Sequence, residues 1–194
     1  MNSLYDFIVK PLNERYDNEI KVGDKSLIVN TTIENHRFVS KRAVVVSVPT
    51  AYSSPIKVGD EVYVHHNIFR RWYDVKGKQR NSAKYFKDNM YFCSIDQIYM
   101  YNSKSNLDYC FIKPIDNKSY LHTRLEQPCE GVVHTCPTNK YIKPQDHIVF
   151  KPDSEFEFII NNERLYCMRL KRIVLNYGYY KDKAENYRVS SESS

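Results

Sequence analysis

Several histidine and cysteine residues of this sequence have side chains that could bind a metal ion. His65 and His66 are adjacent, and neighbouring side chains of an extended strand point to opposite faces, so the two rings are not expected to share an ion. Cys129, His134 and Cys136 are also ligand types, but their spacing matches no standard zinc pattern. We therefore expect packing roles for these side chains and neither a metal nor a cofactor.

Catalytic motifs cannot be read from the sequence either. No Ser-His-Asp or Cys-His arrangement is apparent, and no pair of carboxylates is placed for acid–base work. A Walker loop and a GxGxxG turn are both absent from the sequence. We therefore expect that the protein is not an enzyme.

A basic and aromatic segment spans residues 70–88. It contains seven lysines and arginines, interleaved with aromatic residues at Trp72, Tyr73, Tyr85 and Phe86. Such a pattern occurs where aromatic rings stack on the bases of nucleic acids. A charge-rich loop is more often only solvated, however, so we expect an exposed loop and no nucleic-acid partner. Contact with a neighbouring subunit is the remaining alternative.

An apolar tripeptide, Leu27-Ile28-Val29, has polar neighbours on both sides, Lys25-Ser26 and Asn30-Thr31-Thr32, within the stretch 20–38. It is interpreted either as a short strand of the fold or as a docking segment exposed on a mobile loop. Burying each side chain contributes about 1.5–3 kcal/mol, and ordering the loop costs roughly 2–5 kcal/mol. One loop would therefore bind weakly, whereas several loops on one assembly would gain about 10²–10⁴ in avidity.

The strands that must position these residues occur twice along the chain. The segment Ile56–Val64, with its Lys-Val-Gly-Asp turn, matches Ile142–Phe150 at a distance of 86 positions. Three further pairs of segments match and occur in the same order in both halves: Phe7–Leu12 with Phe111–Ile115, Val44–Pro49 with Val132–Pro137, and Met90–Met100 with Leu165–Leu175. Four matches in series indicate an internal repeat, which changes the expected number of domains.

The repeat predicts an all-β protein with two tandem domains. The first domain spans residues 1–102, the second spans 109–176, and 177–194 is expected to be a polar flexible tail. Within this plan we expect a buried strand over residues 39–48, a strand over 61–69, a hairpin-like pair of strands over 90–101, a linker over 102–108 and a loop over 152–163.

Length, charge and cysteine content bound the class of protein. The 194 residues suffice for two small domains, and the formal net charge of +6 permits an acidic partner without requiring one. No apolar run reaches the roughly 20 residues of a membrane span, and the N-terminus lacks the layout of a secretory signal. Five cysteines without a CxxC pair indicate reduced thiols. A cytoplasmic protein without a membrane partner is expected.

The ordered series of motifs resembles the GroES-type co-chaperonins, the ring-shaped lids of GroEL-type chaperonins. The resemblance rests on Ile8-Val9-Lys10-Pro11, the tripeptide Leu27-Ile28-Val29, Val45-Val46-Ser47-Val48-Pro49, Ile56-Lys57-Val58-Gly59-Asp60-Glu61-Val62 and Asp96-Gln97-Ile98-Tyr99. It covers nearly all of the first repeat but only the strands of the second. It implies two small irregular β-barrels, a homo-oligomeric ring joined through terminal strands, and a chaperonin partner that itself binds the ATP.

The resemblance also implies which residues meet the chaperonin. In the family, a tripeptide on the loop after the first strand docks on the partner, and Leu27, Ile28 and Val29 are the matching residues here. The second repeat has no such tripeptide; Tyr120-Leu121-His122 is its nearest apolar stretch. The sequence also has no room between Val48 and Ile56 for the hairpin that roofs the bacterial lid.

Two functions follow from these expectations. The first is a co-chaperonin-like ring that caps a chaperonin and assists protein folding. The second is a structural or assembly ring protein, for example of a virion, that keeps the barrel without binding a chaperonin. The tandem, roofless plan and the composition rich in Lys, Asn, Ile and Tyr fit a bacteriophage-encoded form.

Overall fold

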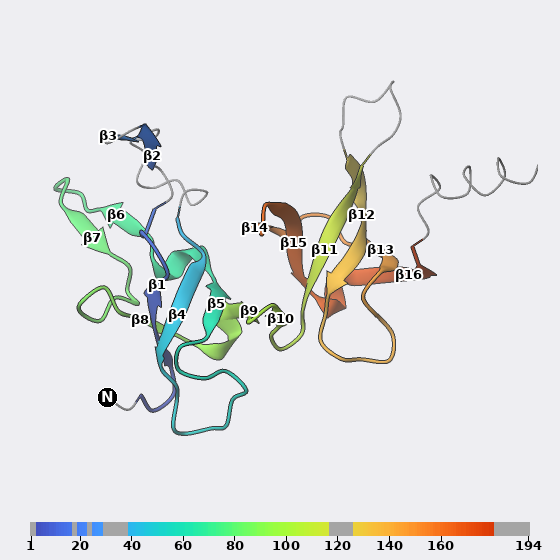
Figure 1. The fold of residues 1–194 in the computed structure, drawn as a ribbon, viewed down its shortest axis with the longest axis horizontal. Helices are drawn as coiled ribbons and strands as arrows, with labels where there is room; N and C mark the ends of the chain where they lie inside the picture. Colours follow the sequence, from blue (N-terminus) through green and yellow to red (C-terminus); the bar gives the residue numbers. More distant parts are fainter. Residues whose placement is uncertain (1–2, 17–18, 23–24, 29–38, 117–125, 181–194) are drawn as a thin grey trace, which may run out of the picture. The chain divides into compact units, whose positions relative to one another are not determined.

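The protein is all-β, as its sequence predicts. The computed structural model describes residues 3–16, 19–22, 25–28, 39–116 and 126–180 (Figure 1). None of these segments forms a helix that is long and apolar enough to cross a membrane. The chain divides into two compact units, Met1–Asn106 and Leu107–Ser194.

The first unit is built on an antiparallel six-stranded sheet with the order β10-β9-β5-β4-β1-β8. Its strands are β1 (Phe7–Pro11), β4 (Arg42–Ser47), β5 (Glu61–Val64), β8 (Tyr91–Cys93), β9 (Ile98–Tyr101) and β10 (Lys104–Ser105). Two hairpins lie in the connections: β2 (Glu19–Val22) with β3 (Lys25–Ile28), and β6 (Arg71–Tyr73) with β7 (Gln79–Asn81). Single turns of 3-10 helix, η2 (His66–Ile68) and η3 (Ile95–Gln97), follow β5 and precede β9.

The second unit is a six-stranded antiparallel sheet with the order β14-β15-β11-β12-β13-β16. Its strands are β11 (Tyr109–Asp116), β12 (Glu126–Thr135), β13 (Asp146–Phe150), β14 (Phe156–Ile160), β15 (Glu163–Arg169) and β16 (Ile173–Tyr179). The 3-10 turn η4 (Leu170–Arg172) joins the last two strands.

Five strands follow the same order in both sheets: β9-β5-β4-β1-β8 in the first and β16-β13-β12-β11-β15 in the second (Figure 1). The registers agree as well. Val9 pairs with Val45 in the first sheet, and a bulge directly precedes it. Ile112 pairs with Val133 in the second sheet, again directly after a bulge. The segments that match in sequence thus occupy equivalent positions in two β-barrel-like sheets.

The turn that precedes β5 in the first sheet and the turn that precedes β13 in the second have the same hydrogen bonds. The Asp60 Oδ2 accepts the backbone N–H of Lys57 at 2.7 Å, and the Asp146 Oδ2 accepts that of Lys143 at 2.9 Å. The residue before each aspartate has a positive φ, +89° at Gly59 and +71° at Gln145. Each aspartate also donates its own backbone N–H to the carbonyl of the same lysine at 3.2 Å, so a backbone and a side-chain bond close each turn together.

Each sheet packs on its own apolar core. The first core gathers Phe7, Val9, Val45, Val62 and Tyr91 with further buried residues. The second gathers a smaller set: Cys110, Ile112, Val133, Ile148, Phe150 and Met168. The prediction that β4 is buried throughout is wrong in part, because its side chains alternate: Val45 is buried, whereas Val44 and Val46 are half-buried.

Three sequence-based expectations need correction. Residues 90–101 do not form a hairpin, since β8 pairs with β1 and β9 pairs with β5, in different parts of the sheet. The expected linker over 102–108 contains β10, and the Asn106 amide donates to the carbonyls of Ile95 and Ile98. The expected loop over 152–163 contains β14, which pairs with β15 through a turn at Asn161-Asn162.

Two expected boundaries also move. The strand predicted over 61–69 ends at Val64, and η2 begins two residues later. The start of the tail predicted at residue 177 is wrong, because β16 continues to Tyr179. Residues 181–194 lie outside the described residues.

The turn aspartate makes stability depend on pH. The backbone N–H of Lys57, with a further bond from the Asn102 side chain, holds the pKa of Asp60 below its ordinary value. The carboxylate therefore stabilises the fold above about pH 4, and this stability is lost as the pH falls through the lowered folded-state pKa. Since Asp60 lies at the surface, its contribution is at most about 1 kcal/mol.

We expect urea unfolding at pH 7 and pH 3 to differ less in Asp60→Asn than in the wild type, because the amide does not titrate. Asp88→Asn is the control, since no ion pair of Asp88 is found among the described residues. A pH dependence that Asp60→Asn leaves unchanged would contradict this role of the turn.

Candidate functional site

Two of the three residues of the predicted docking tripeptide belong to a β-hairpin. Leu27 and Ile28 lie in β3, where Leu27 pairs with Ile20 and Ile28 pairs with Glu19 of β2. Val29 lies outside the described residues. The described part of the predicted mobile loop thus has regular backbone pairing. It belongs to the connection between β1 and β4.

The basic segment over 70–88 is largely exposed, as expected, but it contains the β6–β7 hairpin and is not a loop throughout. Its tip is closed by Asp74, whose Oδ1 accepts the backbone N–H groups of Lys76 and Lys78. The Asp74 Oδ2 forms an ion pair with Arg80 at 3.0 Å, and Gly77 supplies the positive φ of the turn. The hairpin therefore has a defined shape, which an isolated run of charges would not have.

Arg15 and Tyr16 hold the root of this β6–β7 hairpin. The buried Arg15 guanidinium donates two hydrogen bonds to the Phe69 carbonyl and one, at 2.8 Å, to Asn81 Oδ1. It also lies 5.1 Å from the centroid of the Tyr91 ring, and burial lowers its pKa. The Tyr16 hydroxyl accepts the Arg71 N–H at 2.6 Å. Sequence reasoning missed this role, because both residues stand in a polar stretch without a motif.

A groove of about 520 Å³ opens beside the hairpin root. It is lined by Asn67, Arg70, Trp72, Ser82, Ala83, Lys84 and Gln97. The Ser82 hydroxyl donates to the Ile68 carbonyl at 2.7 Å and accepts the Lys84 N–H, which holds the wall after β7 in place. The Trp72 Nε1 donates to the Asn81 carbonyl at 3.2 Å. The indole orientation is thereby fixed, while 45% of the residue stays exposed.

The groove is positively charged and has an unmet hydrogen-bonding group. Its charged lining residues are Arg70 and Lys84, and none of the described residues that line it is acidic. The Arg70 Nε atom is buried and has no hydrogen-bond partner in the part of the chain that the structure describes. Buried polar groups normally have partners, so the Arg70 Nε is an unmet donor at the wall of the groove.

A second groove, of about 420 Å³ in the second unit, has the opposite character. Its lining includes Glu126, Asp153, Glu155 and Arg164. Arg164 forms ion pairs with Glu126 and, at 3.4 Å, with Glu157, while the Tyr166 hydroxyl donates to Glu126 at 2.7 Å. Burial and this carboxylate raise the pKa of Tyr166 to about 12. These side chains satisfy one another and leave an acidic surface.

The prediction that His65 and His66 point to opposite faces of a strand is wrong. The two residues lie at the start of η2, and their rings stack with centroids 4.3 Å apart. His65 Nδ1 accepts the Asn67 N–H at 3.1 Å, and burial lowers the pKa of His65. Among the described residues, no three metal-ligating side chains gather at one place.

Cys129, His134 and Cys136 do not converge on one point. The exposed His134 lies 3.7 Å from Glu163, and the Cys136 thiol donates to the Ile142 carbonyl at 3.6 Å. Cys136 and Cys129 both pack against the second core, in agreement with the expected packing role. Cys110 donates a hydrogen bond to Cys136, which raises the pKa of the first thiol and lowers that of the second.

The edge strand β16 exposes apolar side chains that its counterpart β9 buries. Tyr99 and Met100 of β9 are 4% and 1% exposed. Val174 and Leu175 occupy the equivalent places in β16 and are 55% and 49% exposed. In the first unit β10 pairs with the outer edge of β9, whereas no strand among the described residues pairs with the outer edge of β16.

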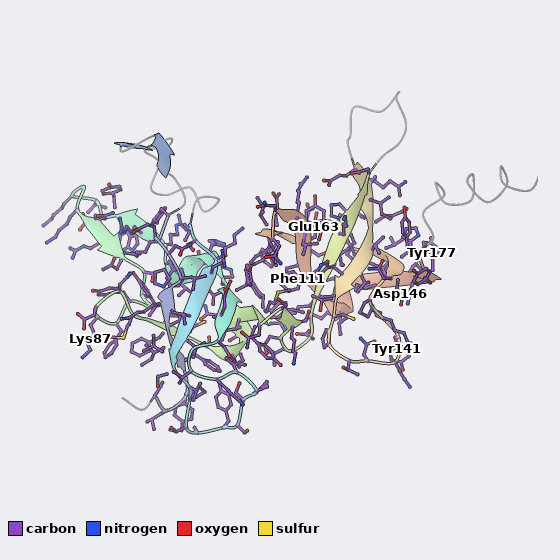
Figure 2. All side chains as sticks on the ribbon, viewed as in Figure 1. Lys87, Phe111, Tyr141, Asp146, Glu163 and Tyr177 are labelled. Carbon is purple, nitrogen blue, oxygen red and sulfur yellow. The ribbon has the colours of Figure 1, made fainter. Side chains whose placement is uncertain are left out.

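β16 is nevertheless firmly attached to its sheet. The Asn176 side-chain amide donates to Asp146 Oδ2 and to the Tyr141 carbonyl, both at 2.8 Å (Figure 2). The Tyr177 ring lies beside the His147 ring, with centroids 5.1 Å apart. The exposed apolar side chains therefore lie on a strand that is fixed to its sheet and not on a frayed end.

No protein-family model matches the sequence, and a search of curated proteins also finds no match.

We expect Arg15→Lys to lower the free energy of unfolding by about 1.5–3 kcal/mol, because an ammonium cannot replace the forked bonds to the Phe69 carbonyl and Asn81. Urea unfolding followed by the fluorescence of Trp72, the only tryptophan, measures this decrease. Arg42→Lys is the matched control, since its ion pair with Glu61 is exposed and worth at most about 1 kcal/mol. Equal unfolding midpoints for both variants would contradict the anchoring role of Arg15.

Proposed function

We propose that the protein is a co-chaperonin-like ring protein that caps a GroEL-type chaperonin and assists protein folding. Copies of the chain join into the ring through β16, and the β2–β3 hairpin carries the residues that meet the chaperonin. The observation that carries the proposal is the apolar, exposed outer edge of β16.

An edge strand of this kind is well suited to assembly. Its unpaired backbone groups and apolar side chains are a template for another chain, and monomeric proteins normally cover or charge such an edge. Val174, Leu175, Tyr177 and Tyr179 are all about half or more exposed. Burying each of them in an interface is worth about 1.5–3 kcal/mol.

A ring requires that β16 meets a different surface of the next copy, because pairing of β16 with β16 of a second copy would close as a dimer. Such head-to-tail contacts produce a ring when their rotation closes. Leu4 and Tyr5, which are exposed just before β1, provide apolar surface near the other end of the chain.

The chaperonin contact is proposed for Leu27, Ile28 and Val29 on the basis of sequence resemblance and position. Leu27 and Ile28 lie in the connection between β1 and β4, where the co-chaperonin docking loop is expected. Paired backbone in β2 and β3 lowers the ordering cost of docking relative to an unstructured loop, since fewer residues must be fixed on binding.

The second candidate is a structural or assembly ring protein, and it rests on the same observation. The same edge strand β16 serves any head-to-tail assembly, with or without a chaperonin. The two candidates share the ring and differ in whether the tripeptide binds a partner.

Co-sedimentation with a GroEL-type chaperonin in the presence of ATP separates the two candidates. We expect wild type to sediment with the chaperonin and Leu27→Ser/Ile28→Ser/Val29→Ser to remain in the supernatant. The physical reason is that avidity multiplies the affinity of each single site, so a substitution that weakens every site at once abolishes binding of the ring. Lys25→Ser is the control within the same strand and should still bind.

An assembled wild-type protein that does not sediment with the chaperonin would refute the capping function and support the assembly function. Binding that the triple variant retains would refute the assignment of the tripeptide.

We expect Leu175→Lys to weaken self-association about 10- to 100-fold, because the substitution places a charge where an apolar side chain is buried between copies. Light scattering over a range of concentrations measures the molar mass against the 23.1 kDa monomer. Val58→Lys is the control, since Val58 is also more than half exposed but lies in a turn of the first unit. If both variants assemble like the wild type, β16 is not the contact.

A further inference from the structure

We propose that the groove beside the β6–β7 hairpin binds single-stranded nucleic acid, with a base stacked on Trp72 and phosphates held by Arg70 and Lys84. This inference is independent of the proposed ring function. It also reverses the expectation drawn from the sequence, because the exposed residues 70–88 include a hairpin and line a groove.

The groove has the size of a site for one nucleotide. Its volume of about 520 Å³ lies within the range of sites that hold small ligands. Its walls come from η2, β6, the segment after β7 and η3, all within the first unit. The hairpin root is fixed by Arg15 and Tyr16, so the groove is preorganised before a ligand arrives.

The aromatic wall is suited to a base. Trp72 is half-exposed, and its indole is held by the bond from Nε1 to the Asn81 carbonyl, so stacking would cost little conformational freedom. Base stacking on such a ring is tolerant of sequence, because every base has a π-face. The Gln97 Oε1 already accepts bonds from Ser94, which leaves its amide nitrogen directed to other acceptors such as a base edge.

The charged wall is suited to phosphate. The Arg70 Nε is buried without a partner, and neither Arg70 nor Lys84 has an ion-pair partner among the described residues. A phosphate in the groove would neutralise both cations. Arginine is especially suited to this role, since its planar fork matches the geometry of phosphate oxygens.

The surroundings of the groove favour a polymer over a free nucleotide. Residues 67–90 contain seven lysines and arginines against two aspartates, and Asp74 is already paired with Arg80. The same segment also contains the exposed aromatic residues Tyr73, Tyr85 and Phe86. Lys87, labelled in Figure 2, lies with its Nζ 5.3 Å from the Phe86 ring centroid. A basic surface that alternates with aromatic rings is typical of a path for a single strand.

The test uses the full-length protein and a single-stranded oligothymidylate of about ten nucleotides, within the site size of a single-strand-binding domain, with AMP and inorganic phosphate as separate probes. We expect the oligonucleotide to quench the fluorescence of Trp72, the only tryptophan, with an affinity that falls steeply as salt is added. AMP and phosphate should bind at least about 10-fold more weakly, because each fills only part of the surface.

Variants assign the contacts by fluorescence anisotropy of a labelled oligonucleotide. Arg70→Gln/Lys84→Gln should weaken binding at least about 10-fold, and Trp72→Leu should weaken it roughly 5- to 150-fold. The matched control is Lys57→Gln/Lys104→Gln, which removes the same charge from exposed positions outside the groove and should change affinity less than about threefold. Unfolding midpoints like that of the wild type establish that each variant is folded.

Three results would overturn the proposal. The first is no quenching and no anisotropy change at low salt. The second is an equal loss of affinity in the control pair, which would indicate attraction to net charge alone. The third is AMP binding as tightly as the oligonucleotide, which would make the groove a mononucleotide site.

Discussion

Each of the two sheets depends on a turn of the same kind, in which an aspartate carboxylate accepts the backbone N–H of the residue three positions before it. Asp60 and Asp146 make this bond with Lys57 and Lys143. The turn sets where the third strand begins, and a shift of one residue would place its core side chains on the opposite face. Val62 and Ile148, both fully buried, follow the two aspartates at the same distance. The same local hydrogen bond therefore fixes register and core together in both units.

The differences between the two units carry the proposed functions. The first unit inserts the β6–β7 hairpin between β5 and β8, and with it a basic groove. The second unit carries β14 at the corresponding place and an acidic, internally paired groove. The edge strand β16 of the second sheet exposes apolar side chains that the first sheet buries. A common sheet thus supports one proposed surface for nucleic acid and another for assembly.

Much of the sheet was predictable from sequence because β-branched runs and repeated turns are local signals. The matching segments around Val45 and Val133 fall at equivalent places in the two sheets. Two edge strands, β10 and β14, were not predictable: they are short or half-exposed, and pairing with a neighbouring strand decides their structure. The same limit applies to β8 and β9, which are close in the chain but lie in different parts of the sheet.

The groove and the side-chain contacts around it were harder to predict from the sequence than the strands. Arg15 stands in a polar stretch, and its role depends on a carbonyl 54 residues away. The groove likewise joins Asn67, Trp72 and Gln97 from three separate elements. The stacked His65 and His66 rings were missed because the chain leaves the strand at Val64. Each of these features is a tertiary arrangement without a periodic pattern in the sequence.

Hydrogen–deuterium exchange at the backbone amides of β16 in the assembled protein tests the proposed ring contact most directly. If copies join at this edge, the amides of residues 173–179 should exchange as slowly as those of β13, because both edges of the strand are then hydrogen-bonded. Exchange of the outward amides within seconds, in a protein that remains assembled, would show that the copies join elsewhere and would contradict the proposed ring contact.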